Sequence, residues 1–206
     1  NPALGMTTVV PPIHAAKPAK ANAAKLVEAL RESRATNSFG SPVLWAGIVA
    51  ECERQRVELP SLKRVLTAGA ALPPDLARRL HRVLPAGEVY SPYGATEALP
   101  LTVIAGRTIL ESTAPRTEKG AGICVGSPVP KVRVVIGRPL RPEATTLGDF
   151  ELLEDGERGE ILATGPMVTH EYHRREEATR AAKARDAEGR VWHRMGDLGY
   201  LDEQGR

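Results

Sequence analysis

Apolar residues in the first half of the chain recur every three or four positions, the spacing that puts them on one face of a helix. The clearest case begins at Ser41-Pro42, where the hydroxyl can cap a helix and the proline suits its first turn. The apolar stripe of this helix consists of Trp45, Ile48, Val49 and Cys52. The same spacing predicts helices over Pro18–Arg34 and Pro73–Leu84.

Short apolar runs lie between these predicted helices. Thr7–Val10, Leu62–Thr67 and Glu88–Tyr90 are each typical of a short buried strand. Strands that alternate with helices pair in parallel, because each helix carries the chain back to the same end of the sheet. We therefore expect residues 1–113 to form an α/β subdomain that contains a parallel sheet.

The pattern changes after about residue 113, where helical periodicity fades and short β runs are separated by Gly, Pro and Asp. The predicted strands are Ile123–Val125, Val132–Ile136, Phe150–Leu153, Glu160–Thr164 and Val191–His193. One predicted helix interrupts them at about Arg174–Arg185, and residues 137–148 have the composition of a loop. We expect residues 114–206 to form a β-rich subdomain, a twisted sheet or distorted barrel, so that the whole chain is an α/β protein.

Composition narrows the class of protein. The 206 residues carry 28 basic and 25 acidic side chains, for a formal charge of +3, with both signs interspersed. Aromatic residues make up only 4%, so nucleic acid is not an expected partner. No apolar run reaches the roughly 18 residues that a membrane span needs. Cys52 and Cys124 lie far apart in no metal-ligand spacing, which favours reduced thiols and a cytoplasmic location.

A group of chemically different side chains follows the predicted strand Glu88–Tyr90. The run Tyr93-Gly-Ala-Thr-Glu97 contains an aromatic ring, the flexible Gly94, a hydroxyl and a carboxylate. The ring of Tyr93 can stack on a base, and Thr96 can donate a hydrogen bond to a phosphate. The hard carboxylate oxygens of Glu97 suit Mg²⁺. This combination indicates a site for a nucleotide and a metal ion.

Two other segments carry compatible chemistry. Asp197 stands in an acidic turn near the end of the chain, and a carboxylate can accept hydrogen bonds from both hydroxyls of a ribose. Small residues follow the predicted strand Leu62–Thr67, at the end where parallel sheets bind ligands, and they would let a flat base approach the backbone. These small residues are Gly69, Ala70 and Ala71. By itself, the second segment is more typical of a tight turn between a strand and a helix.

These segments resemble the YGxTE and GDxGxxDxxG motifs of the adenylate-forming superfamily, which contains acyl-CoA synthetases, luciferases and peptide-synthetase adenylation domains. The resemblance extends over roughly residues 4–206 and includes, in the family order, Ser61–Leu72, Val125–Pro128 and Gly159–Pro166. Three positions depart from the family motifs: Met195 replaces a threonine, and in the GGAPL turn Ala68 replaces a glycine and Ala71 replaces the proline. The runs Tyr93–Pro100 and Trp192–Asp197 look most like the β-lactone synthetases of bacterial long-chain olefin biosynthesis.

The resemblance implies a role for each candidate residue. Tyr93 would stack on adenine, and Asp197 would bind the ribose. Thr96 and Glu97 would be catalytic, with Thr96 on a phosphate and Glu97 as the metal ligand. The residues expected to bind the nucleotide are Gly69, Ala70, Ala71, Tyr93, Gly94, Thr96 and Asp197.

The resemblance also implies an activity. The parent protein would be an ATP-dependent ligase that uses Mg²⁺ and activates a carboxylic acid, a fatty or 3-hydroxy fatty acid, as acyl-AMP. The second step would form a CoA thioester or close a β-lactone. The family's phosphate loop and catalytic lysine belong outside the present sequence. We therefore expect an internal piece of a longer enzyme, which would not adenylate by itself.

Two alternatives stay open. One is an adenylation domain that activates an amino acid, and the other is a non-catalytic nucleotide-binding module. The nucleotide site requires Tyr93 and Asp197, about a hundred positions apart, to meet in the fold. The sequence indicates neither the acyl chain nor the acceptor nor the oligomeric state.

Overall fold

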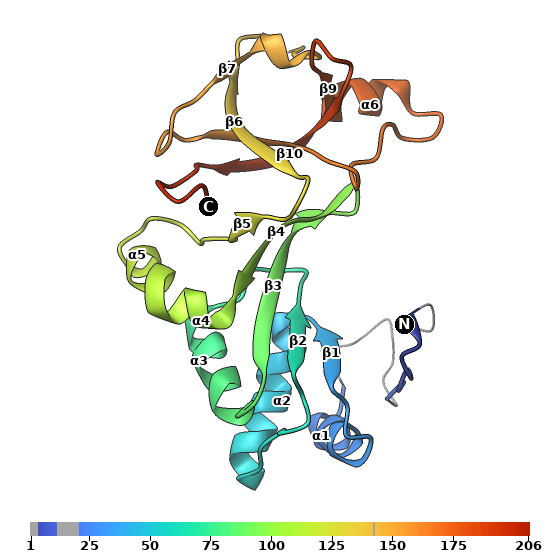
Figure 1. The fold of residues 1–206 in the computed structure, drawn as a ribbon, viewed down its shortest axis with the longest axis vertical. Helices are drawn as coiled ribbons and strands as arrows, with labels where there is room; N and C mark the ends of the chain where they lie inside the picture. The colour runs from blue at the N-terminus through green and yellow to red at the C-terminus, as the bar shows by residue number, and fades with distance from the viewer. Residues whose placement is uncertain (1–3, 12–20, 142) are drawn as a thin grey trace. The chain divides into compact units, whose positions relative to one another are not determined.

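The computed structural model describes residues 4–11, 21–141 and 143–206, and the chain forms two compact units (Figure 1). Unit 1 comprises the described residues of Asn1–Ser91 together with Ile104–Cys124. Unit 2 comprises Pro92–Val103 and the described residues of Val125–Arg206. The contacts define these units, and the division into domains of 1–113 and 114–206 stays a prediction.

Unit 1 is built on a parallel sheet. Its strands are β1 (Asn37–Gly40), β2 (Arg64–Thr67) and the part of β3 (Glu88–Ala95) that precedes Pro92. β2 pairs in parallel with β1 and with β3, so that Leu66 lies opposite Phe39 on one side and Tyr90 on the other. Helical crossovers between the strands make the parallel pairing possible, as the alternating pattern predicted.

Two helices connect these strands, α2 (Pro42–Gln55) and α3 (Pro74–Val83), and a third helix, α1 (Ala23–Glu32), precedes β1 (Figure 1). α2 begins where the sequence predicted, because the Ser41 hydroxyl accepts a hydrogen bond of 3.3 Å from the Leu44 backbone N–H. The stripe predicted for α2 is buried in the core of unit 1, with Trp45, Val49 and Cys52 all at 0% exposure. Burial of this apolar face is the main source of the helix's stability.

Unit 1 is completed by a run of short helices. These are α4 (Gly106–Thr108), the π-helical turn η3 (Ile109–Thr113) and α5 (Ala114–Glu118). Ile109 and Ala114 from this run are buried in the same core as the three longer helices.

Unit 2 is rich in antiparallel strands. The part of β4 (Ala98–Ala105) up to Val103 belongs to this unit and pairs with β5 (Ser127–Pro128), and a second sheet has the strand order β7-β6-β8-β10-β9. Every pair in the second sheet is antiparallel. Its elements, with the short helices η4 and α6, are β6 (Arg133–Pro139), η4 (Leu147–Asp149), β7 (Phe150–Leu152), β8 (Gly159–Thr164), α6 (Glu176–Ala182), β9 (Lys183–Arg185) and β10 (Val191–Gly199). The predicted fold class, a parallel α/β layer followed by a curled β-rich part, is confirmed.

Some predicted elements are wrong. Thr7–Val10 forms no strand, and Val10 is 82% exposed, because an apolar run becomes a strand only where a neighbour pairs with it. Ile123–Val125 is irregular for the same reason, and the pairing with β4 falls on β5 instead. Pro18, the predicted start of the first helix, lies outside the described residues, and α1 begins at Ala23.

Other elements were missed or misplaced. β1 has only four residues and no alternating pattern, and β4 contains Pro100, which argues against a strand in a sequence. β3 continues to Ala95, beyond the predicted end at Tyr90. The helix predicted over Arg174–Arg185 ends at Ala182, because the next three residues pair with β10 as β9.

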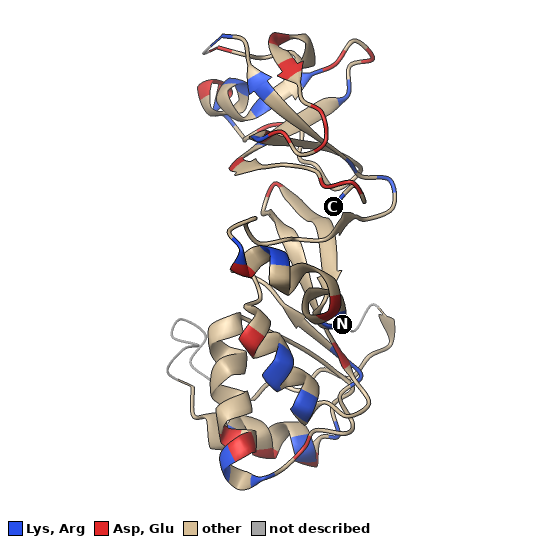
Figure 2. Cartoon of the chain, turned by 90° about the vertical axis from the view of Figure 1, so that its left-hand side faces the viewer, with Lys and Arg blue, Asp and Glu red and all other residues tan. Residues whose placement is uncertain are grey.

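Charged side chains of both signs are mixed within each unit (Figure 2), in agreement with the interspersed pattern of the sequence. Among the helices of the described residues, none combines the length and the apolar character that crossing a bilayer requires.

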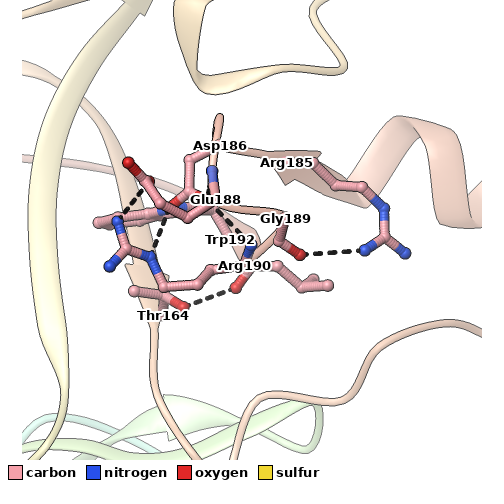
Figure 3. A network of polar contacts seen from close by, with 8 residues as sticks. Thr164, Arg185, Asp186, Glu188, Gly189, Arg190 and Trp192 are labelled. Atoms are coloured by element: carbon pink, nitrogen blue, oxygen red, sulfur yellow. Dashed lines mark hydrogen bonds and ion pairs between the residues drawn. The ribbon is translucent and has the colours of Figure 1, made fainter.

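The hairpin between β9 and β10 is held by a carboxylate (Figure 3). Asp186 accepts hydrogen bonds from the indole Nε1 of Trp192 at 2.8 Å, from Arg190 Nε at 2.7 Å and from the Arg190 backbone N–H at 2.9 Å. Burial alone would raise the pKa of Asp186, but these bonds outweigh it and lower the pKa to about 2. The hairpin therefore keeps an ionised Asp186 at neutral pH.

We expect Trp192→Ala to lower the free energy of unfolding by about 3–5 kcal/mol, the usual cost of removing a buried tryptophan. Trp192 is 1% exposed and packs in unit 2 with Phe150 and Leu162. Trp192→Phe keeps most of the packing and loses the bond to Asp186, so its cost is smaller. Urea unfolding followed by circular dichroism measures both variants. Leu140→Ala is the control, because Leu140 is 66% exposed; an equal loss in Trp192→Ala and Leu140→Ala would contradict the prediction.

Candidate functional site

The predicted YGATE motif lies at the turn between β3 and β4. Tyr93 and Gly94 belong to the end of β3, and Thr96 and Glu97 form the turn before β4 begins. A Cβ at Gly94 would clash with the carbonyl oxygen of Ala98, so the close approach of the two strands requires a glycine here. The strands thus place Thr96, which is exposed, and Glu97, which is half-buried, side by side at the tip of the turn.

Tyr93 and Asp197 meet in unit 2. The Tyr93 hydroxyl donates a hydrogen bond of 2.6 Å to Asp197 Oδ2 across a sequence separation of 104 residues. The Tyr93 ring packs against a cluster that includes the buried Ala98 and Leu101. Asp197 is exposed, and within the described residues no other hydrogen bond to its carboxylate is found. The Tyr93 phenol is therefore held beside a carboxylate that can still accept hydrogen bonds from other donors.

A break in the register of β10 presents Asp197. β10 pairs with β8 up to Arg194 and again from Leu198, with an irregularity in between. Gly196 has a φ of 72°, which glycine adopts without strain. A forked ion pair spans the irregularity: Arg194 donates two hydrogen bonds of 2.9 Å to Glu160. The family's glycine before the aspartate therefore has a physical reason in this chain, since it lets the strand bulge.

The environment of Tyr93 changes its acidity. Burial raises the pKa of Tyr93 above its ordinary value of 10.0, and the hydrogen bond to Asp197 and the charge of that carboxylate raise it further. The phenol therefore stays protonated at neutral pH, and its O–H remains a donor to Asp197.

Glu97 has a contact that the sequence did not indicate. The Tyr172 hydroxyl donates a hydrogen bond of 2.7 Å to Glu97 Oε1, and the Thr169 backbone N–H donates one of 2.8 Å to the Glu97 carbonyl oxygen. The bond from Tyr172 and one from the residue's own backbone N–H lower the pKa of Glu97, against the opposing effect of burial. Glu97 is therefore an ionised and oriented carboxylate.

Two buried basic groups lie close enough to Glu97 to affect its pKa. Lys183 is 6% exposed and donates a hydrogen bond of 3.1 Å to the Thr169 hydroxyl. His193 is 4% exposed, and its Nδ1 lies 3.0 Å from the Ala182 carbonyl oxygen. Burial lowers the pKa of Lys183 and of His193, while the charge of Glu97 acts in the opposite direction on both. The positive charge of Lys183 in turn helps to keep Glu97 ionised.

The remaining predicted site residues belong to the other unit. Gly69, Ala70 and Ala71 lie in unit 1, directly after β2 and before α3. Gly69 has a φ of 92°, which explains why a glycine is required at the first of these positions. Their part in a nucleotide site stays a prediction.

The residues at the β3–β4 turn are compatible with a magnesium ion that arrives with a nucleotide. The described residues contain no group of three or more His, Cys, Asp or Glu side chains that could hold a metal ion by themselves. Mg²⁺, however, is commonly bound through one or two carboxylates together with phosphates and waters. Glu97 offers an ionised carboxylate, and the exposed Thr96 offers a hydroxyl beside it. The oxygen donors therefore fit such an ion.

We expect Asp197→Asn to lower the pKa of Tyr93 because it removes the negative charge that disfavours the phenolate. The pKa should stay above 10.0, since burial is the larger cause of the shift and remains. NMR titration of ¹³C-labelled tyrosine measures the change, and Tyr93→Phe identifies the signal. Asp155→Asn removes an exposed carboxylate that has no part in the Tyr93 contact and serves as the control. An unchanged or higher Tyr93 pKa in Asp197→Asn would count against the contact.

Comparison with known proteins supplies the family. Residues 3–173 match the AMP-binding enzyme family. Over its whole length the chain is 43% identical to an olefin beta-lactone synthetase of Stenotrophomonas maltophilia, of which it covers 37%. Over 88% of its length it is 30% identical to a long-chain-fatty-acid–CoA ligase of Thermus thermophilus, of which it covers 31%.

A solved structure has the same fold. The structure of VinN in complex with L-aspartate has a TM-score of 0.68 and 29% sequence identity, over 87% of this chain and 39% of that protein. The chain thus spans about a third of the length of the relatives that it matches. The family match covers residues 3–173, which are most of its sequence. The chain belongs to the AMP-binding enzyme family.

Proposed function

We propose that the protein containing this chain is an ATP-dependent ligase that joins the carboxylate of a fatty or 3-hydroxy fatty acid to the α-phosphate of ATP and releases pyrophosphate. The acyl group of the acyl-AMP would then pass to the thiol of CoA, or close to a β-lactone through the 3-hydroxyl, and AMP would leave. A cytoplasmic location belongs to the same proposal.

The contact between Tyr93 and Asp197 is the observation that carries the proposal. A nucleoside needs a flat surface for the base and an acceptor for the two ribose hydroxyls. The half-buried ring of Tyr93 supplies the first, and the exposed carboxylate of Asp197 supplies the second. Because the phenol donates to only one carboxylate oxygen, the other can accept from a sugar hydroxyl.

Thr96 and Glu97 would serve the phosphate end of the substrate. The exposed hydroxyl of Thr96 can donate to a phosphate oxygen, and Glu97 can hold the Mg²⁺ that accompanies ATP. Bound Mg²⁺ would screen the phosphate charge as the acid's carboxylate approaches. The small residues Gly69, Ala70 and Ala71 would let the base approach the backbone after β2.

The names of the relatives support the choice of acid. One is an olefin beta-lactone synthetase and another is a long-chain-fatty-acid–CoA ligase. The higher identity, 43% against 30%, favours the first of these over the second. A 3-hydroxy fatty acid is therefore the preferred substrate, and CoA is the alternative acceptor.

Activation of an amino acid is the second candidate function. A protein of the same fold and 29% identity has been solved in complex with L-aspartate. Both candidates share the adenylation step and differ only in the acid.

Pyrophosphate exchange on the full-length protein tests the proposal. We expect ATP–pyrophosphate exchange with long-chain and 3-hydroxy fatty acids and none with a panel of amino acids that includes L-aspartate. Exchange with an amino acid alone would favour the second candidate. If the protein binds AMP but exchanges pyrophosphate with no acid, it is a non-catalytic nucleotide-binding module.

We also expect Asp197→Ala to raise the KM for ATP by about 10-fold or more, because a charge-assisted hydrogen bond contributes about 1.5–3 kcal/mol. The KM for the fatty acid should change little, since Asp197 would face the nucleoside. Asp155→Ala, at an exposed turn, is the matched control. Equal effects on the KM values of both substrates would contradict a role in binding the sugar.

A further inference from the structure

Glu97 is held at two points by one segment of unit 2, residues 169–172. At the first point, the Thr169 backbone N–H donates to the Glu97 carbonyl oxygen at 2.8 Å. At the second, the Tyr172 hydroxyl donates to Glu97 Oε1 at 2.7 Å. Neither Thr169 nor Tyr172 belongs to the sequence motifs.

Both the backbone and the ring of Tyr172 have partners. Its backbone N–H donates to the Thr179 hydroxyl at 3.0 Å, and that hydroxyl donates to the Arg175 carbonyl oxygen at 2.9 Å. The Nζ of Lys183 lies 5.8 Å from the centre of the Tyr172 ring, within the range of a cation–π contact. Lys183 also binds the Thr169 hydroxyl at 3.1 Å. The phenol therefore has little freedom to leave Glu97.

Such an arrangement has a chemical consequence for a metal ligand. A carboxylate on a turn rotates freely unless another group fixes it, and the loss of that freedom opposes metal binding. A partner that occupies one carboxylate oxygen leaves lone pairs on the other for a cation. Groups that orient a ligand in this way commonly change metal affinity by about 10- to 100-fold.

We propose that Tyr172 is a positioning residue: it holds the Glu97 carboxylate so that a divalent cation bound with the nucleotide finds a preset oxygen ligand. Thr179 and Lys183 act indirectly, because they contact Tyr172 and hold it in place. The inference rests on the proposed function, since it assigns Glu97 to the metal that accompanies ATP.

Equilibrium binding of Mn²⁺ to the full-length protein in the presence of ATP provides the test. The electron paramagnetic resonance signal of free Mn²⁺ measures the ion left unbound. We expect Tyr172→Phe, which removes only the hydroxyl, to raise the dissociation constant for Mn²⁺ by about 10-fold. ATP binding in the presence of EDTA, measured by calorimetry, should stay unchanged, because Tyr93 and Asp197 are untouched.

Three further variants sharpen the result. In a Glu97→Gln background, Tyr172→Phe should add no further loss of Mn²⁺ affinity, because the group that it orients is gone. Thr179→Val removes the acceptor of the Tyr172 backbone N–H and should weaken Mn²⁺ binding in the same direction, but less. Tyr90→Phe, a half-buried tyrosine of β3 in unit 1, is the matched control and should change neither measurement.

The outcomes separate the inference from the proposed function. Unchanged Mn²⁺ affinity in Tyr172→Phe, together with weaker binding in Glu97→Gln, would overturn the positioning role and leave the proposed function intact. Loss of metal-free ATP binding in Tyr172→Phe would also overturn it, since the residue would then be a general structural support. A wild-type protein that neither binds ATP nor exchanges pyrophosphate would overturn both.

Discussion

The hydrogen bond between Tyr93 and Asp197 is the contact on which the candidate site depends. It joins the end of β3 to the irregular part of β10, two segments that are 104 positions apart. Other interactions hold each of the two residues in place. The Tyr93 ring packs in an apolar cluster, and the forked ion pair of Arg194 and Glu160 spans the break beside Asp197. The polar pair can therefore face solvent without losing its geometry.

The two ends of the site in unit 2 are built differently. At the contact with Asp197 a single neutral donor, the Tyr93 hydroxyl, faces an exposed carboxylate. At the β3–β4 turn Glu97 is surrounded by donors and buried basic groups, which lower its pKa. A carboxylate that must accept from two sugar hydroxyls benefits from open lone pairs. One that must hold a metal ion benefits from being ionised and fixed.

Sequence motifs predicted the residues that would touch a ligand but not the residues that hydrogen-bond to them. Tyr172 lies in an irregular segment with no periodicity, and Lys183 sits where a helix was expected to continue. Nothing in the local pattern connects either residue to Glu97, because both lie at least 75 positions further along the chain and approach it only in the folded protein. The one hint in the sequence was that Tyr172 lies only a few residues after the Gly159–Pro166 motif.

The sequence by itself determined the elements whose pattern is local. The apolar stripe and cap of α2, the crossover pattern of unit 1 and the glycines at tight approaches all follow from residue spacing and backbone sterics. Only the tertiary structure decided which strands found partners: Thr7–Val10 did not, whereas the short β1 did. It also decided which polar groups meet. Strand pairing and side-chain contacts join residues far apart in the chain, and a local pattern carries no information about the partner.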